Sequence, residues 1–284
     1  MCISETDLIL NPDGSVYHLG LLPQHVSDNI IFVGDPGRVQ RISQHFDHLE
    51  HKVTKREFIT HTGTYKGKRV TAMSTGMGTD NIEIAMIELD ALFNIDLQTR
   101  KLKKNQVTLH IIRIGTSGSI RKEIAPGTVL GAKYGVGLDI YNTQYKMPQN
   151  EFEREIAGAL KKKLQLPYDP YCLKGSETLI NKIAFDMPLG NTVTTPGFYA
   201  AQGRQLRIPP RNNTYLKKLL SFNHKGFKLS NVEMETSTIY GFARLMGHEA
   251  LSINAILANR VQKKFFKDTH KPIDSIIEMV LERI

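Results

Sequence analysis

The chain has 284 residues, 40% of them hydrophobic, and a formal net charge of +9 at pH 7. This length is enough to bury one large core, and no low-complexity or Pro/Ser-rich stretch interrupts it, so a single domain spanning 1–284 is predicted. The two cysteines, the acidic N-terminal segment and the lack of an apolar run approaching about 18 residues argue against a disulfide-rich secreted protein, a signal peptide and a membrane span. A cytoplasmic protein without membrane partners is expected.

Strands and helices are predicted to alternate along the chain. Short apolar runs bounded by Gly, Pro or Asn predict strands at 29–33, 69–74, 107–114, 128–136, 191–195, 228–234 and 250–257. Apolar residues at helical spacing predict helices at 80–93, 151–164, 236–246 and 272–284, and a shorter one from Val39 onward. This alternation predicts an α/β fold, a three-layer α/β/α arrangement with a central mixed and largely parallel β-sheet.

The positive charge is scattered rather than gathered in one patch. Local basic runs occur at 100–104, 161–163 and 263–264, and none carries interleaved aromatic residues. A solvated surface is the favoured interpretation, so no nucleic-acid partner is expected, and a basic protein that binds nucleotides or RNA without turnover is the alternative. A small anionic substrate would be attracted by the same positive field.

A glycine-proline turn follows the first predicted strand, at 33–39. Gly34 would let the backbone approach a ligand, Pro36 suits the start of a helix, and Arg38 would project from the first helical turn toward an anion. A tight turn with a surface arginine explains the same residues. Alone, this segment is a weak indication of a phosphate site.

A second segment of this kind, 113–118 (RIGTSG), comes at the end of the predicted central strand. A guanidinium, two small hydroxyls and two glycines could wrap an oxyanion, because glycines admit positive φ and expose N–H groups. An anion, most plausibly phosphate, is therefore predicted at the carboxyl end of this strand. A glycine-rich bend in which Arg113 pairs with a carboxylate is the alternative.

Two later segments carry side chains suited to a heterocycle and a sugar. In the glycine-bearing loop 195–204, Phe198 could stack on a planar ring while Gln202 and Arg204 hydrogen-bond its edge, although an ordinary surface loop explains the same residues. At 232–237, strand alternation places Glu233 and Glu235 on one side, where they could meet sugar hydroxyls. Acids beside a helix N-terminus are also ordinary dipole partners, and this applies most to Glu233.

Other chemistries have weaker support. Neither cysteine lies in a nucleophile motif, and no G-x-S-x-G elbow occurs. His45, His48 and His51 have a spacing that could line one helical face, but no fourth ligand lies nearby, so exposed side chains are expected there and no metal site is predicted.

In this order, the segments resemble the nucleoside phosphorylase family whose members form trimers and hexamers. The likeness runs from 17–21 (YHLGL) to 258–262 (ANRVQ) and so covers almost the whole chain. The ordered set of segments makes the match specific, since no single one of them would.

The resemblance implies a role for each matching position. The implied phosphate ligands are Gly34, Arg38, Arg113 and Thr116, with Arg56 supplied by a neighbouring subunit. The implied ribose ligands are Glu233, Met234 and Glu235, with His18 supplied by that neighbour, and the implied base ligands are Ser117, Gly118, Phe198, Gln202 and Arg204. Catalysis would be carried by Arg113, Arg204, Gln202 and Glu235, without metal or covalent intermediate.

The resemblance also selects the pyrimidine branch of the family. Purine-specific members carry a Ser-Asp pair near the end of the last core strand, whereas 256–261 (ILANRV) contains no acid. The implied reaction is phosphorolysis of uridine to uracil and ribose 1-phosphate, with inorganic phosphate as co-substrate and no cofactor. A nucleoside hydrolase and a purine nucleoside phosphorylase of the same fold are the alternatives.

The implied assembly is a homodimer that shares its active sites, within a hexamer, and a monomer should therefore be inactive. Two departures from the family pattern stand out. The segment 79–81 (TDN) puts a metal ion between subunits in doubt, and 96–106 has the character of an insertion before the central strand.

Overall fold

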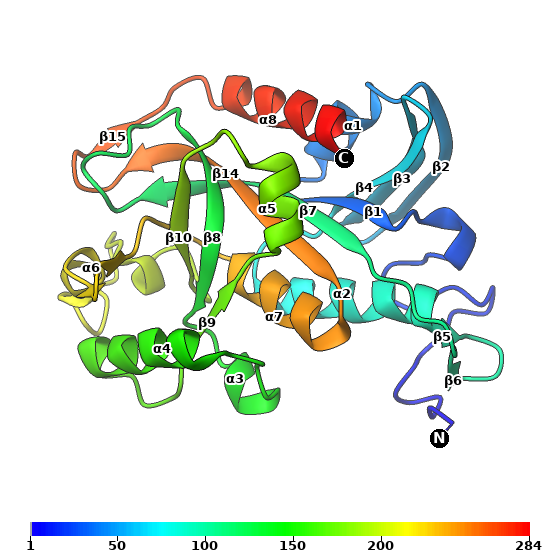
Figure 1. Cartoon of the computed structure of the whole chain (residues 1–284), viewed down its shortest axis with the longest axis horizontal. Coiled ribbons are helices and arrows are strands. Elements are labelled where there is room, and N and C mark those ends of the chain that lie inside the picture. The colour runs from blue at the N-terminus through cyan, green and yellow to red at the C-terminus, as the bar shows by residue number, and fades with distance from the viewer. Residues whose placement is uncertain (1) are drawn as a thin grey trace.

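The computed structural model describes residues 2–284. The strands of its central sheet are β1 (Asn29–Val33), β2 (His48–Lys55), β3 (Phe58–Tyr65), β4 (Lys68–Ser74), β7 (His110–Ser119), β8 (Val129–Gly137), β9 (Tyr171–Lys174), β10 (Leu189–Thr194), β13 (Asn231–Glu233), β14 (Glu249–Asn259) and β15 (Lys264–Phe265). They form one 11-stranded sheet in the order β15-β14-β8-β10-β13-β7-β1-β4-β3-β2, with β9 beside β8 (Figure 1).

One end of this sheet closes on itself. β7 pairs in parallel with β1 and β14, and its last residues pair antiparallel with β13. β14 also pairs antiparallel with β8, which pairs in parallel with β10, and β10 pairs in parallel with β13. The strands β7, β14, β8, β10 and β13 therefore form a closed ring, and β1, β4, β3 and β2 extend from it as an open sheet.

Helices cover both faces of the sheet. α1 (Gly37–Ser43), α5 (Glu177–Ile183) and α8 (His270–Arg283) pack on one face, and α2 (Thr79–Asn94) and α7 (Thr236–Met246) on the other (Figure 1). Neighbouring residues of a strand supply the two cores in turn, because successive side chains point to opposite faces. Ile30 and Phe32 join the α2 and α7 core, whereas Ile31 and Val33 join the α1, α5 and α8 core. The predicted α/β class with a central mixed sheet is confirmed. The sheet is not largely parallel, as was predicted, because six of its eleven strand pairings are antiparallel.

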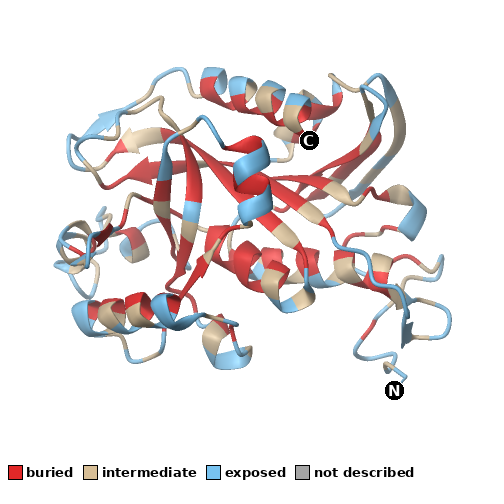
Figure 2. Ribbon diagram, viewed as in Figure 1, coloured by how far each residue is buried: buried red, intermediate tan, exposed pale blue. Residues whose placement is uncertain are grey.

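A third apolar cluster lies under α4 (Glu151–Leu164) and α6 (Tyr215–Leu220), beside the closed ring. α4 begins with a capping box, in which Asn150 Oδ1 accepts from Glu153 N–H over 2.9 Å and Glu153 Oε2 accepts from Asn150 N–H over 2.8 Å. The remaining short elements are α3 (Tyr141–Gln144), the 3-10 turns η1 (Pro23–His25) and η2 (Ala200–Gln202), and the hairpins β5 (Ile95–Asp96) with β6 (Lys101–Leu102) and β11 (Asn223–His224) with β12 (Phe227–Lys228). Buried residues follow the central strands, and exposed ones the outer helix faces (Figure 2).

The predicted bounds of the strand at 107–114 are wrong at both ends, and the segment predicted to follow it as a turn is not a turn. β7 begins at His110 and continues through Ser119, so the segment 113–118 lies inside the strand. The reason is tertiary, since β14 pairs with β7 along this whole stretch and β13 adds a partner near Gly118.

Four strands of the central sheet, β2, β3, β9 and β15, were not predicted. β2 is largely exposed or half-buried, so it lacks the apolar alternation by which strands are recognised. His45, His48 and His51 share no helical face, because His48 and His51 lie on β2 and His45 follows the end of α1. Of the exposed side chains expected there, His48 is exposed, whereas His45 and His51 are half-buried. The predicted strand at 228–234 is divided between β12 and β13, and the predicted insertion at 96–106 holds part of the β5–β6 hairpin.

Within residues 2–284, no helix combines the length and the apolar character that crossing a membrane requires.

Candidate active site

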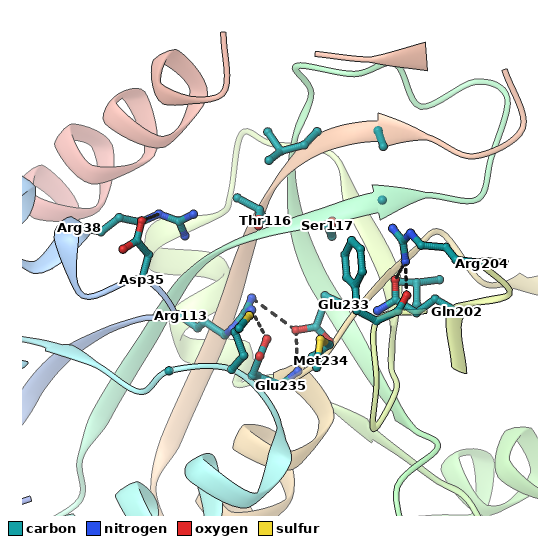
Figure 3. A pocket seen from close by; sticks show the side chains of 18 of the residues that line it. Asp35, Arg38, Arg113, Thr116, Ser117, Gln202, Arg204, Glu233, Met234 and Glu235 are labelled. Carbon is teal, nitrogen blue, oxygen red and sulfur yellow. Dashed lines mark hydrogen bonds and ion pairs between the residues drawn. The ribbon is translucent and has the colours of Figure 1, made fainter. Parts of the chain in front are cut away.

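A cavity of about 520 Å³ opens where β1 and β4 end, beside the middle of β7 and the start of α7. All but two of the predicted site residues line it. They are Gly34, Arg38, Arg113, Thr116, Ser117, Gly118, Phe198, Gln202, Arg204, Glu233, Met234 and Glu235. In Figure 3, Arg38 lies at one end, Arg113, Met234 and Glu235 in the middle, and Gln202 and Arg204 at the other end.

The first end of the cavity has a guanidinium with unused donors. Arg38 Nε lies 3.9 Å from Asp35 Oδ2, and within residues 2–284 the Arg38 side chain makes no hydrogen bond. Burial lowers the pKa of Arg38, and the nearby Arg113 acts in the same direction, while Asp35 opposes it. Beside it, Gly34 passes close to Gly76, where a Cβ would lie 3.2 Å from the Gly76 carbonyl oxygen. This end therefore offers a guanidinium whose N–H donors are free to bind an anion.

Arg113 lies in the floor of the cavity and is 5% exposed. Its Nη2 donates to Glu235 Oε2, its Nη1 donates to Asn254 Oδ1 over 3.1 Å, and Nη1 lies 3.4 Å from Glu233 Oε2. Burial acts to lower the pKa of Arg113, but the charges of Glu235 and Glu233 outweigh it and raise the pKa. The guanidinium is thus charged and held rigidly.

The two glutamates have different surroundings. Glu233 Oε2 accepts the backbone N–H of Glu235 and of Thr236, both over 2.9 Å, and Glu233 Oε1 accepts the Thr194 hydroxyl over 2.6 Å. Burial raises the pKa of Glu233, although Arg113 opposes this. Glu233 therefore serves the N-terminus of α7, as its position before a helix suggested.

Glu235 faces the cavity between the two ends. Besides the bond from Arg113, its Oε1 accepts the backbone N–H of Gly78 over 2.8 Å. This bond ties the loop before α2 to the start of α7. The carboxylate keeps further lone pairs, since each oxygen can accept more than one hydrogen bond.

The second end of the cavity pairs an amide with a guanidinium. Arg204 lies with its Cζ 3.7 Å from the Phe198 ring centroid, and its Nη1 donates to the Phe198 carbonyl over 2.6 Å and to Gln202 Oε1. Burial lowers the pKa of Arg204 to about 10, with a further contribution from Arg260. Ser117 adds a hydroxyl, which accepts from Asn231 Nδ2 over 2.9 Å.

Some residues around the site were not predicted. Arg260 Nη1 donates to the Gln202 carbonyl over 3.1 Å, and so ties the loop of Phe198 and Arg204 to β14. Asn254 contacts Arg113, as described above. Asn254 could have been found in the sequence, because Ser252 and Asn254 form a polar pair at strand spacing within an otherwise apolar run.

His18 and Arg56 do not line the cavity of their own chain. His18 Nδ1 lies 2.6 Å from Glu88 Oε1, and the Arg56 Cζ lies 6.0 Å from the Tyr17 ring centroid. Arg56 occupies the turn between β2 and β3, and the next residue, Glu57, does line the cavity. Their assignment to a neighbour's site stays a prediction. Within the described part of the chain, no three His, Cys, Asp or Glu side chains are placed to hold a metal ion.

Comparison with known proteins identifies the family. Residues 28–282 match the family model described as "Phosphorylase superfamily". The chain is 31% identical over 262 residues to a uridine phosphorylase of Thermococcus kodakarensis, covering 91% of this chain and 83% of the relative. It is 29% identical over 245 residues to a DeoD-type purine nucleoside phosphorylase of Oceanobacillus iheyensis, covering 83% and 84%.

A solved structure extends this likeness to three dimensions. The crystal structure of a Trypanosoma brucei nucleoside phosphorylase, described as showing uridine phosphorylase activity, superimposes with a TM-score of 0.89 at 29% identity and covers 98% of this chain and 99% of that one. The chain therefore belongs to the phosphorylase superfamily, the family of the nucleoside phosphorylases.

Proposed function

We propose that this nucleoside phosphorylase acts on uridine and converts it with inorganic phosphate into uracil and ribose 1-phosphate. The observation that carries the proposal is the order of groups along one cavity. The Arg38 guanidinium stands at one end, Arg113 and the Glu235 carboxylate in the middle, and an amide with a guanidinium for a planar base at the other end (Figure 3).

The chemistry follows from this order. A phosphate oxygen attacks C1′ of the ribose while the C1′–N1 bond breaks and its electron pair goes to the base. Arg38 and Arg113 hold the attacking phosphate in place, and Glu235 holds the ribose hydroxyls. Gln202 and Arg204 stabilise the negative charge that develops on uracil, which then takes a proton from solvent.

The base end favours a pyrimidine over a purine. None of the residues proposed to surround the base is acidic, so none of them can protonate a purine N7; they are Ser117, Gly118, Phe198, Gln202, Arg204, Leu257 and Ala258. The Asn259 side chain on β14 is used in hydrogen bonds within the fold, because its Nδ2 donates to the Arg121 and Ile124 carbonyls over 2.8 and 2.9 Å. This supports the pyrimidine branch of the family.

The proposal includes a shared site. A partner subunit would bring His18 to the ribose and Arg56 to the phosphate, since both lie on a surface outside the cavity of their own chain. The functional unit is then a homodimer, within a hexamer.

The direct test follows uracil release from uridine with and without inorganic phosphate, with inosine in parallel. Cleavage of uridine alone, dependent on phosphate, is expected. Cleavage of inosine would overturn the pyrimidine assignment, and cleavage without phosphate would indicate a hydrolase. Salt-dependent RNA affinity without turnover of either nucleoside would indicate a binding protein.

Arg38→Ala is expected to raise the KM for phosphate about 10- to 100-fold, because a charged hydrogen-bond donor to the anion is lost. The KM for uridine should change little. Stability should also change little, because the ion pair of Arg38 with the exposed Asp35 is loose. Steady-state kinetics in both substrates and a thermal melt provide the measurement.

Arg41→Ala is the matched control, one turn along α1. Arg41 pairs with Asp274 on α8, with Nη2 to Oδ1 at 2.6 Å, and does not line the cavity. If both variants lost phosphate affinity equally, the effect would come from α1 and not from the Arg38 guanidinium.

A further inference from the structure

A closed circuit of four buried hydrogen bonds and one ion pair includes the Arg113 guanidinium. Arg113 Nη1 donates to Asn254 Oδ1 over 3.1 Å, Asn254 Nδ2 donates to Ser252 Oγ over 3.4 Å, and Thr236 Oγ1 donates to the same Ser252 oxygen over 2.8 Å. The Thr236 N–H donates to Glu233, whose Oε2 lies 3.4 Å from Arg113 Nη1. Asn254, Ser252 and Thr236 are fully buried. These five residues, the Arg113 circuit, join β7, β14, β13 and α7.

Strand register explains how Asn254 reaches the guanidinium. On β14, Asn254 lies opposite Gly115 of β7, and Ser252 lies opposite Arg113. Residues two apart in a strand point to the same face, and the Arg113 side chain extends along β7 over Gly115 toward Asn254. A Cβ at position 115 would lie 1.8 Å from Arg113 Nη1, so the glycine leaves this path open. Gly115 therefore leaves room for the guanidinium, and Asn254 Oδ1 supplies the acceptor that it reaches.

Asn254 is not needed to neutralise Arg113. Glu233 and Glu235 already place two carboxylates on one guanidinium. A third carboxylate would add negative charge beside the site proposed for phosphate, whereas an amide oxygen accepts a hydrogen bond without charge. The neutral Asn254 acceptor can therefore orient the Arg113 guanidinium but does not balance its charge.

We propose that Asn254 is a positioning residue for phosphate. It fixes the rotation of the Arg113 guanidinium, so that the N–H groups not used by the circuit face the anion end of the cavity. Asn254 does not itself line the cavity and acts through Arg113. The proposal rests on the proposed function, because it assumes that phosphate binds beside Arg113.

The test uses Asn254→Leu, which is close to asparagine in size and removes the acceptor. The KM for phosphate is expected to rise about tenfold, the effect of one hydrogen bond to a charged group, while the KM for uridine stays the same. Asn254→Asp keeps the acceptor and adds a charge, so any rise in the KM for phosphate that it causes would come from the charge and not from lost positioning. If Asn254→Leu fails to fold, Asn254→Ala, which also removes the acceptor, carries the test. An unchanged KM for phosphate in a folded variant overturns the proposal.

Asn94→Leu is the control for lost stability. Asn94 is also buried, its Oδ1 accepts the Val107 N–H over 2.7 Å, and it lies at the end of α2 far from Gly78 and the cavity. This variant is expected to melt earlier and to keep the KM for phosphate. An equal rise in that KM would mean that Asn254 acts only through stability, which overturns the positioning role.

A second readout separates this proposal from the proposed function. Thermal melting of each protein is followed with increasing inorganic phosphate and no nucleoside, since a ligand that binds the folded state raises the melting temperature. The parent protein should be stabilised, and Asn254→Leu should need about tenfold more phosphate for the same shift. Equal stabilisation of both overturns the positioning role alone. No stabilisation of the parent, together with no phosphate-dependent cleavage, overturns both.

Discussion

Arg113→Ala is expected to abolish phosphate-dependent cleavage of uridine and to destabilise the protein by about 3–5 kcal/mol. Arg113 is one of the groups proposed to hold phosphate, and it is also the counter-charge of two buried carboxylates. Removing it leaves Glu233 and Glu235, each 4% exposed, without a cation. Chemical denaturation measures the stability loss, and single-turnover kinetics measure the activity of the fraction that is folded.

The stability loss of Arg113→Ala should depend on pH in a defined direction. Burial raises the pKa of Glu233, and Arg113 is the charge that opposes this rise. Without Arg113 the folded-state pKa lies further above the unfolded value, so the carboxyl takes up a proton on folding. Such a group costs stability as pH rises past its unfolded pKa, so the loss should be larger near pH 8 than near pH 5. A loss equal at both pH values would contradict this.

A double variant separates the two roles of Arg113. Arg113→Met with Glu235→Gln removes the cation together with one carboxylate, and it should recover part of the stability while remaining inactive. Unchanged turnover in Arg113→Ala would remove this residue from the phosphate site.

Arg204→Ala is expected to lower kcat for uridine about 10²- to 10³-fold, the usual effect of removing one donor from a developing anion. Arg204 and Gln202 are the polar groups proposed to meet the uracil edge. The fold should be kept, because Arg204 belongs to a loop outside the central sheet. Arg207→Ala, an exposed arginine of the same loop that does not line the cavity, is the control and should keep kcat.

The same pair should also reject cytidine. Arg204 Nη1 donates to Gln202 Oε1, which turns the amide oxygen toward the guanidinium. An acceptor beside a donor matches N3–H and O4 of uracil, whereas cytosine presents an acceptor at N3 and an amino group at C4. A site built on such hydrogen bonds rejects the mismatched base by about 10⁴-fold in kcat/KM. Comparable kcat/KM values for both nucleosides would show that the base edge is read by other groups.

Much of the site could be predicted, because its side chains come in short segments beside strand and helix ends. Arg38, Arg113, Gln202 and Arg204 were all expected in one site, and they line one cavity. Sequence proximity did not reveal how far a strand continues, so 113–118 was interpreted as a turn. Its extended conformation depends on β14, which lies far along the chain.

The glutamates show a second limit. Strand alternation places Glu233 and Glu235 on one side and suggests equal roles at the sugar. In the structure, Glu233 accepts hydrogen bonds from the N–H groups at the start of α7, whereas Glu235 lies in the cavity between Arg113 and Gly78. The different partners of the two acids depend on the position of α7 against β13, which no local sequence pattern contains.

The closed ring of strands also sets the order in which the site can be assembled. Arg113 and Asn254 are 141 residues apart in the sequence, and β14 is the last long strand of the chain. During synthesis, the first half of the chain leaves the ribosome with the arginine but without the strand that holds it. Contacts of such separation form late and slowly, because a long loop must close before they stabilise anything. The cavity around Arg113 is therefore among the last parts of the protein to form, and a chain released before residue 249 would contain most of the cavity wall and both glutamates but not the Asn254 acceptor of Arg113.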